Sequence, residues 1–213
     1  MGANEPEPGS AFWNARYEDV ERLWSLNRNT LLADFVGGLA PGRALDLGAG
    51  EGRNAIFLAQ AGWRVTALDV SDVGLARAAT RAADEGVELE CVVVDWREYT
   101  PAGRFDLVVM AFMHPRPDDR AEMFMRAGEM LVPGGHLFTV GVDLAEHGRR
   151  GPPDAGRLLT VERLRGALGG LDLVRCESVA YEGEGKEGRR AVVDVVAIAR
   201  RPGGDAEPPR PAR

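Results

Sequence analysis

Two acids and a run of glycines stand at spacings that suit the binding of a ribose-bearing cofactor. The segment D-L-G-A-G-E-G occupies residues 46–52 at the end of one apolar run, and a second apolar run ends in Asp69. Glycine has no Cβ, so its backbone can take positive φ and approach a ligand closely. An acid at the end of the second run can accept hydrogen bonds from both hydroxyls of a ribose. The residues with this expected role are Asp46, Gly48, Gly50, Gly52 and Asp69.

The surrounding pattern predicts the elements that must hold these residues. Residues 43–47 read as a short buried strand, and the glycines after it form a turn. Residues 54–61 carry apolar side chains at helical spacing, so the turn leads into a helix N-terminus with unpaired N–H groups. Gly62 ends that helix, and residues 63–69 form the next strand. This order is a βαβ unit with an acid at the end of its second strand.

The glycine spacing distinguishes between cofactors. A dinucleotide fingerprint requires a third glycine at position 53, where this chain has Arg53. Asp46 at the head of the turn favours a cationic group and disfavours a pyrophosphate. The pattern D-x-G-x-G-x-G resembles motif I of the class I S-adenosylmethionine-dependent methyltransferases. That resemblance implies that Asp46 helps to hold the methionine amino group, that the glycine loop passes beneath the cofactor, and that Asp69 binds its ribose.

Later segments fit the same family. Residues 89–94 and 105–111 are β-rich, residues 117–130 have helical apolar periodicity, and Leu131-Val-Pro-Gly-Gly135 resembles the family's turn before a fifth strand at 137–142. Residues 160–168 read as another helix. The alternating runs 171–181 and 191–199 predict a C-terminal hairpin, which a plain dehydrogenase domain does not have. We therefore expect an α/β protein with a three-layer Rossmann-like methyltransferase fold and a seven-stranded, mostly parallel sheet that ends in an antiparallel hairpin.

The resemblance extends to the cofactor contacts. The pair Asp95-Trp96 matches the acid and neighbour that bracket the adenine, and the segment after residue 111 lies at the cofactor rim in this family. The expected cofactor is S-adenosyl-L-methionine, with S-adenosyl-L-homocysteine as product, and we expect no metal. The predicted cofactor-binding residues are Trp13, Tyr17, Asp46, Gly48, Gly50, Gly52, Asn54, Asp69, Val70, Asp95, Trp96 and Ala111.

An aromatic segment precedes the first strand, at residues 12–29. It resembles the N-terminal segment of the thiopurine and tellurite-resistance methyltransferase branch, whose tryptophans cover the cofactor, and this implies a lid that includes Trp13, Tyr17 and Trp24. The alternative is an amphipathic helix that packs Trp13, Tyr17 and Val20 onto the sheet.

Composition indicates one compact domain. The 213 residues carry a formal charge of −7 and 45% hydrophobic residues, enough for one substantial core. The chain has no apolar run of membrane-spanning length and no signal-like start, so we expect a cytoplasmic protein without membrane contact, either monomer or homodimer. Cys91 and Cys176 are expected to be small core residues. The expected segments are a disordered N-terminus at 1–10, a helical lid at 11–36, the methyltransferase domain at 37–200 and a disordered tail at 201–213.

The acceptor is expected to be a small molecule. An acidic chain without a basic stripe argues against nucleic acid as a partner. The loop at residues 143–159, at the carboxyl end of the fifth strand, is expected to border the ligand crevice or to be a mobile surface connection. Its Arg149 and Arg150 either attract an anionic substrate or are solvated charges.

The reaction chemistry follows from the few available bases. A thiol, with a reference pKa of about 8.5, ionises without a dedicated base, which favours S-methylation. The catalytic candidates are His114, after the fourth strand, and Asp143, after the fifth; His114 is alternatively a cap of the following proline turn. N- or O-methylation of an aromatic or heterocyclic metabolite stays open. A non-catalytic cofactor-binding protein also stays open. A nicotinamide-dependent oxidoreductase is a further alternative, but Arg53 and the hairpin argue against it.

Overall fold

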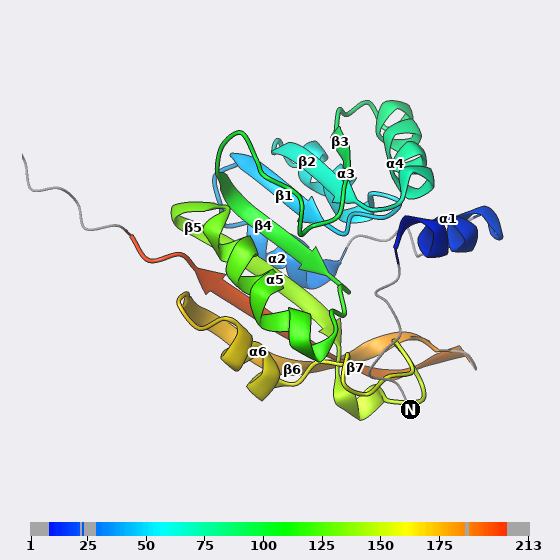
Figure 1. The fold of residues 1–213 in the computed structure, drawn as a ribbon, viewed down its shortest axis with the longest axis vertical. Coiled ribbons are helices and arrows are strands. Elements are labelled where there is room, and N and C mark those ends of the chain that lie inside the picture. The colour runs from blue at the N-terminus through cyan, green and yellow to red at the C-terminus, as the bar shows by residue number, and fades with distance from the viewer. Residues whose placement is uncertain (1–8, 22, 24–28, 186–187, 204–213) are drawn as a thin grey trace, which may run out of the picture.

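The computed structural model of the protein describes residues 9–21, 23, 29–185 and 188–203. Figure 1 shows a central twisted sheet with helices on both faces. The elements in chain order are α1 (Ser10–Glu18), α2 (Thr30–Val36), β1 (Arg43–Leu47), α3 (Arg53–Gln60), β2 (Arg64–Asp69), α4 (Asp72–Asp84), β3 (Glu90–Val93), β4 (Phe105–Ala111), α5 (Pro117–Glu129), β5 (Leu131–Val142), the 3-10 helix η1 (Leu144–Glu146), α6 (Val161–Ala167), β6 (Asp172–Gly185) and β7 (Gly188–Arg200).

The sheet has seven strands in the order β3-β2-β1-β4-β5-β7-β6. Strands β1 to β5 pair with one another in parallel, whereas β7 is antiparallel to both β5 and β6. The predicted fold class is therefore confirmed, including the C-terminal hairpin. All seven predicted strands recur, two of them, 43–47 and 105–111, with the expected bounds.

The core lies on both faces of the sheet because successive side chains of a strand point to opposite faces. On β4, Val108 packs in the cluster beneath α5 and α6, whereas its neighbour Val109 packs in the cluster beneath α2 and α3. In Figure 1, α5 and α6 cover the near face and α2 lies behind the sheet. The three layers of the predicted fold follow from this alternation.

The strand order predicts a ligand crevice at the carboxyl ends of β1 and β4. The chain leaves β1 toward α3 on one face of the sheet and leaves β4 toward α5 on the other face. Ligands of open α/β sheets bind where neighbouring strands send their connections in opposite directions. The predicted cofactor motif at residues 46–52 lies at this point.

Two strand boundaries differ from the prediction. β5 begins at Leu131 and includes the Pro-Gly-Gly segment that was expected to be a turn, because Leu131 pairs with Phe105 before the register shifts. The hairpin connection is also shorter than expected, since β6 extends to Gly185 and β7 starts at Gly188. Most of the glycine- and glutamate-rich segment therefore lies in paired strands.

The N-terminal helix α1 has its main contact with α4 rather than with the sheet. Tyr17 is buried, with its ring against Gly74 of α4. The side chain of Asn14 donates to Asp72 at 2.6 Å and accepts from the Ser71 hydroxyl at 2.6 Å. The alternative in which Trp13, Tyr17 and Val20 pack onto the sheet is thus corrected, and Val20 is exposed.

Three smaller expectations are corrected or limited. Cys91 is exposed on the edge strand β3 rather than buried. Arg201, placed in the expected disordered tail, donates to the carbonyls of Glu129 at 2.8 Å and Leu131 at 2.6 Å, and Ser10 already belongs to α1. Trp24 and the outer parts of the two expected disordered ends, residues 1–8 and 204–213, lie outside the described residues. Within the described part of the chain, no helix is long and apolar enough to cross a membrane.

Candidate cofactor and acceptor site

The glycine loop joins β1 to α3 with three residues at positive φ. Gly48, Gly50 and Gly52 have φ values of 76°, 54° and 77°. The N–H of Gly48 and the N–H of Ala49 both donate to the carbonyl of Leu68, at 2.8 and 3.0 Å, so the loop is tied to the end of β2. A Cβ on Gly52 would lie 2.7 Å from the Cβ of Ala78 on α4. These positions therefore require glycine for both backbone angle and space.

Asp69 ends β2 beside this loop. One of its oxygens accepts from the N–H of Gly50 at 2.8 Å and the other accepts from the N–H of Ser71 at 2.9 Å. Burial raises the pKa of Asp69, and these backbone hydrogen bonds lower it. Each carboxylate oxygen keeps a second lone pair, so the side chain can still accept from a ligand hydroxyl.

Asp46 lies beneath the loop and is 2% exposed. Its Oδ2 atom is buried and, among the described residues, has no hydrogen-bond partner. Burial raises the pKa of Asp46 to about 7, while Arg53 and the backbone N–H of Ala55 lower it. A buried carboxylate with an unmatched oxygen costs free energy that a cationic ligand group would recover. Asp46 therefore fits the amino group of the methionine part of S-adenosylmethionine.

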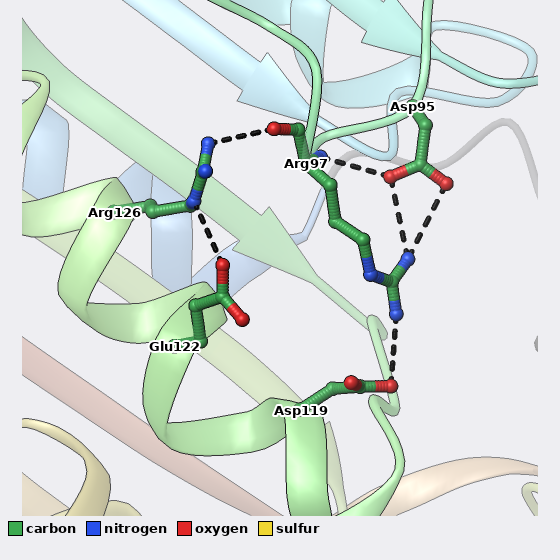
Figure 2. Close-up of polar contacts among 5 residues, drawn as sticks. All are labelled: Asp95, Arg97, Asp119, Glu122 and Arg126. Carbon is green, nitrogen blue, oxygen red and sulfur yellow. Dashed lines mark hydrogen bonds and ion pairs between the residues drawn. The ribbon is translucent and has the colours of Figure 1, made fainter.

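The adenine end of the predicted site is held by a cluster of charged residues. Figure 2 shows Arg97 between Asp95 and Asp119. Asp95 lies two residues after β3, and Asp119 belongs to α5. Arg97 donates to the Asp95 carboxylate at 3.3 Å and to Asp119 at 2.8 Å, and its guanidinium lies 4.4 Å from the ring centroid of Trp96. Trp96 is itself buried in the core cluster under α5. The predicted adenine-bracketing pair is thus fixed to α5, although Trp96 has little exposed ring surface.

The remaining predicted cofactor residues lie on α1, in α3 and at the carboxyl ends of β2 and β4. Asn54, buried in the first turn of α3, accepts from the N–H of Asn29 at 3.4 Å, which ties the N-terminal segment to the helix. Val70 directly follows Asp69, and Ala111 ends β4; both are half-buried. Trp13 and Tyr17 of α1 face each other at 6.5 Å between ring centroids, on the α4 side of the loop. Their predicted role as a lid stays a proposal.

The sequence did not point to Glu51 and Arg77, which fasten the N-terminal segment to the loop. Glu51 is buried, pairs with Arg77 of α4 at 3.1 Å and accepts from the N–H of Leu23 at 3.1 Å. Arg77 also donates to the carbonyls of Val20 and Glu21. The position of Glu51 inside the glycine motif could have indicated a role for it. Its partners could not be predicted, because they come from distant segments of the chain.

His114 is buried after β4 and its ring is already hydrogen-bonded. Its Nε2 accepts from the N–H of Val142 at 3.0 Å, and a further hydrogen bond involves the backbone of Phe112. Burial, together with the charges of nearby arginines, lowers the pKa of His114 to about 4. The ring therefore connects the ends of β4 and β5. This favours a structural role over that of general base, although the partner is β5 rather than the proline turn.

Asp143 is likewise engaged. One oxygen accepts from the N–H of Ala145 at 2.8 Å, as the cap of η1, and the other accepts from the hydroxyl of Ser178 at 2.6 Å. The loop that follows is fastened to the hairpin, because Glu146 pairs with Arg190 and Arg150 lies 3.1 Å from Asp194. The expected mobile connection thus has buried ionic anchors.

One residue at the crevice has an unusual backbone. Phe112, immediately after β4, has a φ of 60°, which is uncommon for a residue with a Cβ. Its ring lies beneath the guanidinium of Arg53, with 5.2 Å between the guanidinium carbon and the ring centroid. Its neighbour Met113 lies against Gly48. Strained residues held in this way often mark ligand sites.

Comparisons with known proteins agree with this geometry. Residues 44–135 match the family model described as a methyltransferase domain. The ubiquinone biosynthesis O-methyltransferase of Cronobacter sakazakii is 33% identical over 133 residues, which make up 61% of this chain and 54% of that protein. The chain spans about half the length of the curated relatives it matches.

Two solved structures share the fold. The N-methyltransferase NodS from Bradyrhizobium japonicum, in complex with S-adenosyl-L-homocysteine, has a TM-score of 0.71 at 21% identity and covers 92% of this chain and 100% of its own. TehB from Haemophilus influenzae has a TM-score of 0.69 at 17% identity, covering 90% of this chain and 66% of its own. These findings support S-adenosyl-L-methionine as the cofactor. The findings therefore agree with the predicted resemblance: residues 44–135 match a methyltransferase domain, and the chain shares the fold of S-adenosylmethionine-dependent methyltransferase structures.

Proposed function

We propose that this protein transfers a methyl group from S-adenosyl-L-methionine to a small-molecule acceptor. The observation that carries the proposal is the buried Asp46, which has an unmatched oxygen at the point where the glycine loop leaves β1. A cationic amino group would satisfy that oxygen, and Asp69 lies beside the same loop to receive a ribose. Both acids and the loop suit one molecule that carries an amino acid and a nucleoside.

The chain's own residues divide the binding between them. Asp46 holds the ammonium group, Asp69 the ribose hydroxyls, and Asp95 with Trp96 the adenine. S-adenosylmethionine supplies an electrophilic methyl group when bound. The protein's contribution to the rate is then to align an acceptor with that group and to exclude water, since the reaction is an in-line displacement.

We further propose that the acceptor atom is the sulfur of a thiol. The thiol loses its proton to solvent, and the thiolate forms a bond to the methyl carbon while the bond from that carbon to the sulfonium breaks. The products are a thioether and S-adenosylhomocysteine. This reaction needs no base from the protein. The engagement of His114 and Asp143 in structural hydrogen bonds supports it.

N- or O-methylation is the alternative, and the comparisons favour keeping it. The curated relative is an O-methyltransferase and NodS is an N-methyltransferase. An aromatic hydroxyl ionises more readily than an aliphatic alcohol, and a heterocyclic nitrogen can react through its lone pair. Neither acceptor needs a strong base from the protein, so both are compatible with the same crevice.

Methyl transfer to matched acceptors tests the proposal. Purified protein is incubated with methyl-labelled S-adenosylmethionine and, separately, with benzenethiol, phenol and aniline. The Asp46→Asn variant serves as the control for turnover that depends on the site. Thioether formation by the wild type alone would support S-methylation, and labelled anisole or N-methylaniline instead would select the alternative. Cofactor binding without any labelled product across a wider panel of thiols, phenols and amines would indicate a non-catalytic binding protein.

A further inference from the structure

Arg53 lies at the boundary between the two halves of the crevice. It is the first residue of α3, directly after the glycine loop. Its guanidinium rests on the ring of Phe112, which follows β4. Its charge interacts electrostatically with Asp46 on β1 and with Tyr181 and Asp194 on the hairpin. Arg53 therefore faces both the predicted cofactor half, over β1 to β3, and the other half, over β4 to β7.

The guanidinium of Arg53 is half-buried but makes no hydrogen bond or ion pair with any of the described residues. Five N–H donors in a planar fork are thus available to a ligand. Burial lowers the pKa of Arg53, and the nearby acidic groups raise it, so the charge is retained. Keeping such a group partly desolvated and unmatched costs free energy, which an anionic ligand would recover.

The acids on the hairpin side of Arg53 already have partners. Asp194 is 0% exposed; it accepts a hydrogen bond from the hydroxyl of Tyr181 and lies 3.1 Å from Arg150. Glu146 is matched by Arg190. Asp194 and Glu146 therefore each have an arginine partner, whereas Arg53 forms no ion pair with a described residue and interacts with Asp46 only through its charge.

The other arginines near the end of β4 make different contacts. Arg157 donates to the carbonyl of His114 at 2.8 Å, and Arg120 donates to the carbonyl of Gly156. Arg150, suggested by the sequence as an anion attractor, is committed to Asp194, and Arg149 is exposed. Arg53 thus differs from Arg120, Arg150 and Arg157, each of which has a hydrogen bond or an ion pair with a described residue.

We propose that the acceptor carries a carboxylate and that Arg53 binds it, which places the acceptor's nucleophile next to the methyl group. This inference rests on the proposed function and narrows its substrate class to anionic small molecules. A guanidinium fork matches a carboxylate through two parallel N–H···O bonds, and the Phe112 ring beneath it holds the fork in one plane. A neutral acceptor of the same shape would leave the fork unmatched.

Binding of a matched acid and amide tests the inference without knowledge of the acceptor. Benzoate and benzamide are titrated into protein saturated with S-adenosylhomocysteine, in the wild type, Arg53→Met, Arg53→Lys and Arg149→Met. Arg149 is the control because it is an exposed cation in the loop after β5. We expect the wild type and Arg149→Met to bind benzoate at least about tenfold more tightly than benzamide, Arg53→Met to lose this preference, and Arg53→Lys to keep part of it.

Other results would overturn the inference. One is a wild type that does not prefer benzoate, and another is an Arg53→Met variant that retains the preference. A third is an Arg53→Met variant that loses affinity for S-adenosylhomocysteine but binds 5′-methylthioadenosine normally, because Arg53 would then serve the cofactor's own carboxylate. The two proposals fail separately: no binding of S-adenosylhomocysteine to the wild type removes the proposed function, whereas normal binding without a benzoate preference removes only this inference.

Discussion

The Oδ2 atom of Asp69 accepts a hydrogen bond from the N–H of Gly50 at 2.8 Å, so the acid that we propose to bind the ribose also fixes the glycine loop after β1. The two halves of the cofactor motif are therefore one unit. A change in either is expected to alter the position of the other.

Replacement of Asp69 by alanine should weaken S-adenosylhomocysteine binding by about 10- to 100-fold, since a hydrogen bond to a charged group is worth about 1.5–3 kcal/mol. The loss combines the missing ribose contact with a less ordered loop. Isothermal titration measures it, with Asp84→Ala as the control because Asp84 is an exposed carboxylate of α4. Equal affinities in the two variants would show that Asp69 does not contact the cofactor.

The affinity for S-adenosylhomocysteine should depend on pH through Asp46. Its pKa in the free protein is about 7, and only the ionised carboxylate attracts an ammonium group. Affinity should therefore rise as the pH increases toward about 7 and level off above it. In Asp46→Asn the affinity should be lower and this rise should be missing. An equally steep rise in the variant would assign the titration to another group.

The same carboxylate should make the cofactor-free protein less stable at high pH. The folded pKa of Asp46, about 7, lies above its ordinary value of 3.8. Between these values the folded protein binds more protons than the unfolded chain, so the free energy of unfolding falls as the pH rises. Chemical denaturation should show Asp46→Asn gaining stability relative to the wild type from about pH 4 to pH 7. A difference between the two proteins that does not change with pH would contradict this account.

His114 should behave in the opposite sense. Its folded pKa, about 4, lies below its ordinary value of 6.5, so its contribution to stability is present above pH 6.5 and is lost as the pH falls toward 4. His114→Ala should lower the free energy of unfolding by about 1–3 kcal/mol, because the N–H of Val142 loses its acceptor. The methyl-transfer rate per folded molecule at pH 8 should change little. A large loss of rate with normal stability would restore the base role.

The glycine at the start of α3 can be tested against a second glycine with similar backbone angles. Gly52 and Gly86 have φ values of 77° and 73°, but only at Gly52 would a Cβ meet a neighbour, Ala78 of α4. Gly52→Ala should therefore cost about 1–3 kcal/mol more than Gly86→Ala in denaturation experiments, because overpacking adds to the same backbone strain. Similar losses in both variants would mean that α3 and α4 adjust without cost.

The sequence predicted the parts of the fold that depend on local patterns. Residues 43–47 and 105–111 are continuous apolar runs with clear turn signals, so their strand bounds followed directly. Helix α4 was missed because much of its buried face consists of alanines, such as Ala78 and Ala82, which give a weak periodic signal. The start of β5 was missed because Pro-Gly-Gly is typical of turns, and only its pairing near Phe105 makes it part of a strand.

The site divides in the same way. Asp46, Asp69 and the glycines lie within one βαβ unit, and their positions relative to one another follow from the chain order. The acceptor half depends on pairing at a distance: Asp194 meets Tyr181 and Arg150 only because β7 pairs with β5 and β6 in one register. Arg53 was noted in the sequence for the glycine it replaces. Its unmatched guanidinium is visible only once those partners are placed.

Isothermal titration of the wild-type protein with S-adenosylhomocysteine tests the central claim most directly, since it requires no acceptor. We predict a dissociation constant of about 1 μM or below. Such affinity is expected when Asp46 binds the amino group and Asp69 binds the ribose hydroxyls. No detectable heat of binding at millimolar ligand would contradict the methyltransferase assignment.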